Sequence, residues 1–351
     1  MINSSLQFLV LDGFEDSLIN KNQWNDLVQR GSSNVIFITY QWQSIWWEVF
    51  GRGKLLLILA LQDGKPIAIA PLFAHKGMIF FVGSGGSDYL DFIGDISDPK
   101  VLEGMLVLAK EQVPDFLGFR FYHVLENSKT HSIIFDLANK KDWVLYDEGE
   151  LPSPILALKD FPEKAHEATR KKSLLRHEAW FSRNGRLKID HLQKSEDILP
   201  HLKNFFEQHI SRWNVTDFPS LFLEPQQQLF YKRITETLAK AGWLIFTRVI
   251  WQENSIAFHF GFNYHGCFLW YKPSFDLAYA KHSPGEVLLR QLLLNARKEE
   301  AQTFDFGLGD EAFKKRFATS TRFVKTLGIY PQNVIKKNYY EKSFGYKPSS
   351  R

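Results

Sequence analysis

The fold is decided by residues 255–318, which read SIAFHFGFNYHGCFLWYKPSFDLAYAKHSPGEVLLRQLLLNARKEEAQTFDFGLGDEAFKKRFA. Two runs of apolar and aromatic residues, at 256–264 and 267–274, are separated by a turn at Gly266. Runs of this composition on either side of a glycine are typical of a β-hairpin. We therefore expect two antiparallel strands in this stretch.

A helix is expected directly after this hairpin. Apolar residues recur at helical spacing from Leu288 to Ala296, with basic residues such as Arg290 on the other face. A strand at 303–308 and a short basic helix that begins at Phe313 follow. The whole stretch predicts the order strand, strand, helix, strand, helix.

The start of the expected helix, at Ser283, has two interpretations. Serine is a preferred N-cap, Pro284 suits the first helical position, and Glu286 completes a capping box. A helix N-terminus carries free N–H groups and partial positive charge, so it can bind a phosphate group, and Gly285 would let a ligand approach closely. The alternative is a well-capped helix without a ligand, because the Glu286 carboxylate competes for the same place.

The order of these elements resembles the acyl-CoA-binding half of the GNAT acetyltransferase fold. The residues are similar to those of its CelD-like (cellulose-biosynthesis-associated) branch, which is related to the FemAB-type transferases. The resemblance covers most of the chain and rests on an ordered set of segments. These segments are His209–Trp213, Ile256–His259, Tyr271–Asp276, Ser283–Gly285, Phe304–Gly307 and Phe313–Lys314, with weaker matches at Ala70–Phe73 and Ser87–Asp91.

The resemblance implies an α+β (mixed α/β) protein with two tandem GNAT-like domains, each a mixed central sheet flanked by helices. We place the boundary at Leu151–Pro154, because neighbouring prolines favour an extended connector. Residues 1–151 would form a degenerate GNAT-like domain that lacks a Ser-Pro-Gly segment and serves as a wall of the acceptor cleft. Residues 152–351 would form the acyl-CoA-binding domain.

Other elements are expected from local patterns. In the first half we expect a strand at 35–38, a helix at 41–50, and a hairpin with strands at 55–61 and 66–73. In the second half we expect two helices before the hairpin, at 196–212 and at 226–241. The first half thus repeats the coarse order of the second.

Acyl transfer from a thioester needs an anion site for the coenzyme, a donor to the thioester carbonyl, a base for the attacking group and an acid for the leaving thiolate. The donor would be a backbone N–H at the end of strand 268–274, where the parallel strand at Phe304 splays away. The resemblance implies acetyl-CoA or another acyl-CoA as co-substrate. The residues assigned to coenzyme binding are Ser274, Ser283, Gly285, Glu286, Val287 and Lys314.

Three residues are candidates for proton transfer. His259 lies on a strand beside the expected site and has an unperturbed pKa of about 6.5, although a lone histidine among apolar neighbours is more often a core residue. Asp305 could act as a base, cap a turn or pair with Lys314. Tyr271 could be an acid or a packed strand aromatic. The family commonly has a tyrosine where this chain has Phe313, which cannot donate a proton.

Composition narrows the class of protein. The 351 residues fit two domains, and 44% hydrophobic residues favour packed cores over disorder. The formal charge of +4 suits an anionic coenzyme, and we do not expect nucleic acid as a partner. The single cysteine, Cys267, excludes an internal disulfide, and we expect no metal site. We find no signal peptide and no apolar run of about 20 residues, and we expect a soluble, cytoplasmic protein.

These observations favour an acyl-CoA-dependent N- or O-acyltransferase. The resemblance implies an acceptor in cell-envelope or exopolysaccharide metabolism, either a small molecule or a glycan precursor. One alternative is a FemAB-type aminoacyltransferase that uses charged tRNA on a peptidoglycan precursor. Another is a non-catalytic binding subunit that keeps only the fold. The sequence leaves the oligomeric state open.

Overall fold

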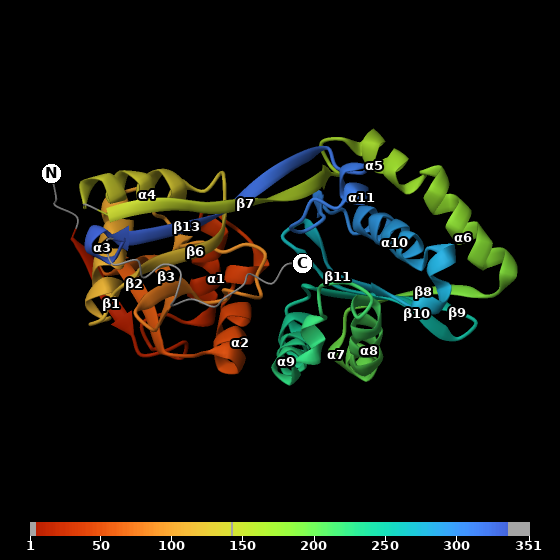
Figure 1. Ribbon diagram of the computed structural model, residues 1–351, viewed down its shortest axis with the longest axis horizontal. Coiled ribbons are helices and arrows are strands. Elements are labelled where there is room, and N and C mark those ends of the chain that lie inside the picture. The colour runs from red at the N-terminus through yellow and green to blue at the C-terminus, as the bar shows by residue number, and fades with distance from the viewer. Residues whose placement is uncertain (1–4, 142, 336–351) are drawn as a thin grey trace. The chain divides into compact units, whose positions relative to one another are not determined.

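The computed structural model describes residues 5–141 and 143–335, which divide into two compact units (Figure 1). Within these described residues, unit 1 consists of those up to Leu151 together with 323–335, and unit 2 runs from Pro152 to Arg322. Unit 1 is therefore discontinuous in sequence, and its last strand follows unit 2 in the chain. Each unit is described by itself.

Unit 1 is built on a mixed sheet with the strand order β1-β2-β3-β4-β6-β13. All neighbours are antiparallel except β4 and β6, which are parallel. The short strand β5 (Ile93–Gly94) pairs with β3 outside this order. The strands are β1 (Leu6–Leu11), β2 (Lys54–Gln62), β3 (Lys65–His75), β4 (Met78–Phe81), β6 (Gly118–Leu125) and β13 (Ser320–Pro331). The hairpin expected at 55–73 is confirmed as β2 and β3.

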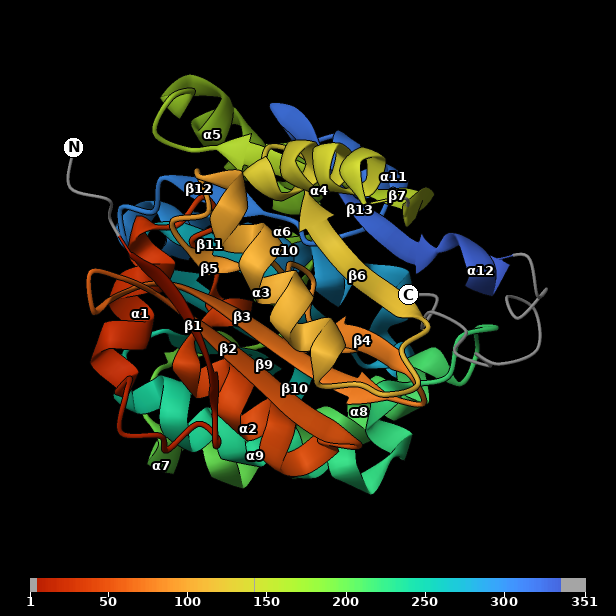
Figure 2. The same cartoon turned by 90° about the vertical axis from the view of Figure 1, so that its left-hand side faces the viewer.

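Helix α3 lies across β1, β2 and β3 and buries its apolar face against them (Figure 2). The strand expected at 35–38 is wrong, because Ile36–Ile38 form a buried 3-10 turn that leads into α2. A run of four apolar residues fits a buried turn as well as a strand. The helices of unit 1 are α1 (Lys21–Arg30), α2 (Tyr40–Phe50), α3 (Pro99–Glu111), α4 (Lys129–Lys140) and α12 (Gln332–Ile335).

In unit 2 the strands of the sheet run in the order β7-β12-β11-β10-β9-β8, and β7 contributes its residues from Pro152 onwards, since its earlier residues belong to unit 1. Here β11 and β12 form the parallel pair, and the other neighbours are antiparallel. The expected hairpin in residues 255–318 is confirmed as β10 and β11. The strands are β7 (Trp143–Ala157), β8 (Leu187–Leu192), β9 (Leu244–Trp251), β10 (Asn254–Tyr264), β11 (Cys267–Phe275) and β12 (Thr303–Asp305).

The two faces of this sheet carry different helices (Figure 1). On one face α10 packs with α5 and α6 over a core that includes Leu288, Leu292 and Trp270. On the other face α8 and α9 cover an aromatic cluster around Phe205. The helices are α5 (Pro162–Thr169), α6 (Lys172–Asn184), α7 (Ser195–Ile198), α8 (Leu202–Trp213), α9 (Pro225–Lys240), α10 (Pro284–Lys298) and α11 (Ala312–Lys315).

Two expectations for unit 2 need correction. The single helix expected at 196–212 is broken by a 3-10 turn at Leu199–His201, because Pro200 has no N–H to continue the helix. The strand expected at 303–308 ends at Asp305. The Leu151–Pro154 segment is extended, as expected, but it lies within strand β7, and the two units divide between Leu151 and Pro152.

Candidate functional site

The parallel strands β11 and β12 are paired only where they begin. Cys267, Phe268 and Leu269 pair with the three residues of β12, and β11 then continues to Phe275. The chain after β12 turns towards β7, because the backbone N–H of Phe306 donates to the Pro154 carbonyl at 3.0 Å. The far half of β11 is therefore separated from the segment that follows β12. The separation begins after Asp305 and not at Phe304, which still pairs with Phe268.

A β-bulge lies in the part of β11 beyond this point. The register places Phe260 opposite Lys272, but Phe262 opposite Leu269. Two residues of β11 therefore stand opposite the single residue Gly261. A bulge re-aims the backbone of the strand that carries it, and here that strand is the one beside the parting of β11 and β12.

His259 fills the space beside the bulge. Its ring lies against Gly261, where an added Cβ would be 2.0 Å from the imidazole Cε1, so only glycine fits at that position. The imidazole Nε2 accepts a hydrogen bond of 3.2 Å from the backbone N–H of Tyr271. His259 is fully buried, and this burial lowers its pKa to about 3. The neutral, enclosed ring favours a role in holding the bulge over the predicted role of general base.

The other two candidates for proton transfer are also engaged in structure. The buried Asp305 carboxylate pairs with Arg322 and accepts hydrogen bonds from the Gly307 N–H at 2.8 Å and the Ser153 hydroxyl at 3.3 Å. The ring of Tyr271 is buried and stacks on that of Tyr231, with 6.4 Å between their centroids. Asp305 ties β12 to its neighbours, and Tyr271 is a packed strand aromatic.

The start of α10 differs from the capping box that the sequence predicts. Ser283 has a left-handed backbone (φ 55°, ψ 58°), and its side chain makes no cap hydrogen bond. The Ser283 carbonyl instead accepts from the Glu286 N–H at 3.0 Å. The Glu286 carboxylate lies 3.5 Å from Arg316 and 3.6 Å from His177. The first turn of α10 is thus left without a side-chain cap, and its acidic residue is paired with basic groups.

The remaining residues predicted to bind coenzyme are only partly brought together. At the end of β11, Gly285 faces Phe275, whose Cδ1 would be 3.4 Å from an added Cβ. Val287 is fully buried in the core beneath α10, so only its backbone can face a ligand. The Ser274 hydroxyl donates to Gln208 at 3.1 Å. Lys314 is buried after β12, where its Nζ bonds the Leu308 carbonyl and Glu311, each at 2.8 Å.

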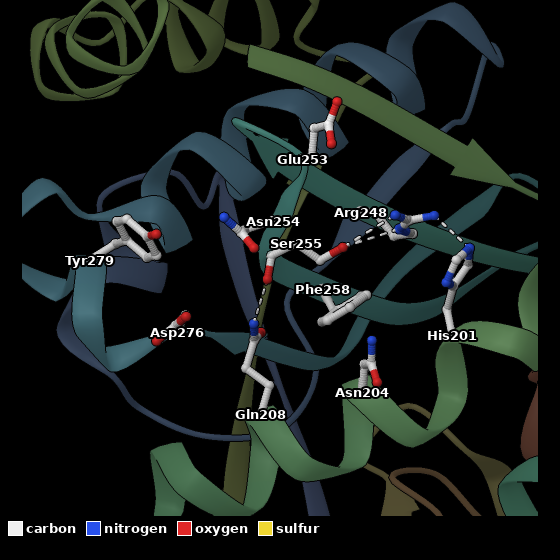
Figure 3. A pocket seen from close by; sticks show the side chains of 10 residues that line it. All are labelled: His201, Asn204, Gln208, Arg248, Glu253, Asn254, Ser255, Phe258, Asp276 and Tyr279. Carbon is white, nitrogen blue, oxygen red and sulfur yellow. Dashed lines mark hydrogen bonds between the residues drawn. The ribbon is translucent and has the colours of Figure 1, made fainter. Parts of the chain in front are cut away.

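A polar pocket of about 460 Å³, which the sequence did not predict, lies on the α8 face of unit 2 (Figure 3). Gln208 donates to the Ser255 carbonyl at 2.9 Å, and Arg248 bonds the Ser255 hydroxyl and the His201 ring. Amides, hydroxyls and charged groups therefore face this space together with the rings of Phe258 and Tyr279. The lining residues are His201, Asn204, Gln208, Arg248, Glu253, Asn254, Ser255, Phe258, Asp276 and Tyr279.

Comparison with known proteins identifies the class of this site. Residues 168–315, from the end of α5 to the end of α11, match the family described as acetyltransferase (GNAT) domain. Unit 2 is therefore built around a GNAT acetyltransferase domain, and the protein is an enzyme of the acyltransferase class. No curated protein sequence matches the chain.

Solved structures show the same fold over most of the chain. FemX has 11% sequence identity and a TM-score of 0.64, over 91% of this chain and 98% of that chain. L-PGS from Bacillus licheniformis has 14% identity and a TM-score of 0.52, over 84% of this chain and 94% of that chain. A tandem GNAT protein from the clavulanic acid biosynthesis pathway has 11% identity and a TM-score of 0.51, over 93% and 98%. The predicted mixed α/β fold with a tandem GNAT-like arrangement is confirmed.

The helices of the described ranges were also compared with what a bilayer requires. In residues 5–141 and 143–335, each helix is too short or too polar to cross a membrane.

Proposed function

We propose that the protein is an acyl-CoA-dependent N- or O-acyltransferase whose coenzyme lies between β11 and β12. The observation that carries the proposal is the parting of these strands after Leu269, at the point where β11 leads into α10. The match to the GNAT domain covers both strands and the helix, which supports this placement.

The start of α10 is suited to the coenzyme diphosphate. The helix dipole places partial positive charge there, Pro284 has no N–H to satisfy, and Gly285 has no Cβ to block a phosphate. Because Ser283 does not cap the helix with its side chain, the first turn keeps this capacity. Glu286 is held by Arg316, which offsets its negative charge.

The thioester would lie along the far half of β11. A backbone N–H of this segment, on the side that β12 leaves, would donate a hydrogen bond to the thioester carbonyl oxygen and stabilise the negative charge that develops as the acceptor attacks. We assign His259 to positioning, because it holds the bulge of β11. Asp305 has the corresponding role for β12 through its pairing with Arg322.

The acceptor is proposed to come from cell-envelope or exopolysaccharide metabolism, in line with the resemblance to the CelD-like branch, and the reaction to take place in the cytoplasm. The polar pocket beside α8 supports a hydroxyl-rich or amide-containing acceptor, since its amide side chains can both donate and accept hydrogen bonds. The role of unit 1 as a wall of the acceptor cleft stays a prediction.

Calorimetry with the full chain tests the proposal. We expect acetyl-CoA to bind with a micromolar Kd. The fold likeness to FemX favours one competing candidate, a FemAB-type aminoacyltransferase, and binding of aminoacyl-tRNA without binding of acetyl-CoA would support that candidate instead. If neither ligand binds, a non-catalytic binding role becomes the better account.

A further inference from the structure

Among the described residues, the guanidinium group of Arg212 contacts aromatic rings but has no hydrogen-bond or ion-pair partner. This residue lies in the last turn of α8, and its Nε is buried. Across residues 5–141 and 143–335, neither a hydrogen bond nor an ion pair to Arg212 is found. A buried donor without an acceptor costs about 1–3 kcal/mol, and more when it is charged. Because buried polar groups in proteins nearly always have a hydrogen-bond partner, this exception calls for an explanation, and a bound ligand is one.

Aromatic rings orient the guanidinium group of Arg212 but do not neutralise its positive charge. The guanidinium carbon lies 4.6 Å from the ring centroid of Phe275 and 5.3 Å from that of Trp213. Burial lowers the pKa of Arg212, and the charge of Glu311 acts in the opposite direction. Glu311 itself is paired with Lys314 at 2.8 Å. Aromatic faces orient a guanidinium but accept few of its hydrogen bonds.

Two more observations mark the same spot as attractive to an anion. The indole Nε1 of Trp213 is buried and also has no hydrogen-bond partner in the described part of the chain. The pKa of His209 is lowered to about 3 by burial and by the positive charges of Lys272 and Arg212. Two buried N–H donors, on Arg212 Nε and Trp213 Nε1, therefore lie here without an acceptor among the described residues.

The position of Arg212 in the fold connects it to the polar pocket. Asn204, Gln208 and Arg212 are spaced four residues apart, so they lie along one face of α8. Asn204 and Gln208 line the pocket (Figure 3). Gln208 also accepts a hydrogen bond from the Ser274 hydroxyl of β11. Arg212 continues this line to Phe275, where β11 ends. Helix α10 packs on the opposite face of the sheet.

We propose that Arg212 binds an oxyanion, a phosphate or a carboxylate, of the acceptor substrate, with the Trp213 indole N–H as a second donor. This rests on the proposed function, in which the coenzyme diphosphate takes the start of α10 on the other face. The planar fork of arginine matches both oxyanions with two parallel hydrogen bonds. The acceptor class is then an anionic polar molecule, such as a sugar phosphate or a uronic acid, whose neutral part lies along Gln208 and Asn204.

The test uses the ¹⁵N-labelled full chain, saturated with CoA, and inorganic phosphate as the probe. The indole N–H resonance of Trp213, assigned with Trp213→Phe, should move saturably as phosphate is added. In Arg212→Met this shift should disappear, and in Arg212→Lys the phosphate affinity should fall by about tenfold, because lysine lacks the fork. The control Arg30→Met removes an exposed arginine of α1 and should respond as the unsubstituted protein does.

Coenzyme affinity, measured by calorimetry, separates the two possible sources of the oxyanion. Arg212→Met should bind acetyl-CoA within about twofold of the unsubstituted protein. A loss of more than about tenfold would mean that Arg212 holds the coenzyme's own diphosphate, which overturns the assignment to the acceptor. The absence of any phosphate-dependent shift in the unsubstituted protein would overturn the oxyanion site itself. If acetyl-CoA does not bind, the proposed function fails, and the titration without CoA still decides whether Arg212 binds an oxyanion.

Discussion

Each unit contains one pair of parallel strands followed by a helix, and the two pairs differ in what lies beside them. In unit 1 the chain that leaves β4 returns over β6: the Leu90 N–H donates to the His123 carbonyl at 3.1 Å, and Tyr89 and Asp91 are buried with it. In unit 2 only residues 276–283 separate β11 from α10. In unit 1 the loop after β4 therefore covers the parallel pair. In the described part of unit 2 the short segment 276–283 leads from β11 to α10 instead.

The first turns of the two helices differ in the same sense. Helix α3 begins with Asp98-Pro99, and the Asp98 carboxylate accepts from the Lys100 N–H at 2.9 Å. Helix α10 begins with Ser283-Pro284 and has no such cap. A protein carboxylate therefore already occupies the anion position in unit 1. This difference supports the prediction that unit 1 is a degenerate GNAT-like domain without a coenzyme site.

The largest effect is expected from a glutamate at the start of α10. Gly285→Glu places bulk and negative charge where the diphosphate is proposed to bind, and acetyl-CoA affinity should fall at least about 1000-fold by calorimetry. Lys100→Glu places the same side chain at the same position of α3 and should change the affinity less than about twofold. Circular dichroism should show both variants folded. Unchanged affinity in Gly285→Glu would remove the coenzyme site from α10.

The second-largest effect is expected from removing the buried carboxylate of each unit, which should destabilise the two units by different amounts. Asp305→Ala removes the buried carboxylate that pairs with Arg322 and should lower the free energy of unfolding of unit 2 by about 3 kcal/mol. Asp91→Ala leaves the hydroxyls of Ser33 and Thr130 without an acceptor and should cost unit 1 about 2 kcal/mol. Hydrogen exchange, read separately in β10 and β2, measures each effect. Asp91→Ala should leave acetyl-CoA affinity unchanged, and a large loss there would contradict the assignment of the coenzyme to unit 2.

Acidification should affect the units in opposite directions. His209 and His259 have pKa values lowered to about 3 by burial, whereas the unfolded chain binds protons from about pH 6.5 downwards. Their contribution to the stability of unit 2 is present above pH 6.5 and should fall by about 2 kcal/mol per histidine on going to pH 5. Burial raises the pKa of Asp91, so its contribution to unit 1 is greatest at low pH and is lost as pH rises.

Hydrogen exchange corrected for intrinsic rates, measured between pH 7 and 5, compares the two units directly. Replacement of the exposed His265 by glutamine is the control and should leave the pH profile of unit 2 unchanged. If β10 kept its protection at pH 5, the neutral, enclosed state of the two histidines would be wrong.

The smallest effect is expected from Gly285→Ala. An added Cβ would lie 3.4 Å from the Phe275 ring, an ordinary contact, and it adds no charge. Acetyl-CoA affinity should change less than about threefold in calorimetry. A loss comparable to that of Gly285→Glu would show that close approach of the backbone, rather than charge, sets the difference between α10 and α3.

Local patterns in the sequence were enough for much of the fold. The hairpin of β10 and β11 and the apolar face of α10 depend on residues close together in the chain, and periodicity predicts them. The strand at 303–308 was predicted too long, because Phe306 and Leu308 are apolar but lie beyond the pairing with β11. An apolar side chain indicates that a residue is buried, but it does not indicate which strand the backbone of that residue pairs with.

The candidate site was less predictable. The left-handed backbone of Ser283 could not be predicted from its residue type, since serine rarely adopts this conformation. The pairing of Glu286 with Arg316 joins residues from different elements, which periodicity cannot reveal. One signal was available and was missed: Gln208 and Arg212 follow Asn204 at intervals of four on a helix whose other face is aromatic.

The strand β13 has a consequence for synthesis of the chain. Its residues 323–331 complete the sheet of unit 1 beside β6, yet the ribosome makes them only after all of unit 2. At about 5–20 residues per second, β6 emerges roughly 10–40 s before this neighbour exists. During that interval one edge of β6 can pair with another nascent chain. Expression at high ribosome density should therefore favour aggregation through unit 1, even though unit 2 carries the proposed chemistry.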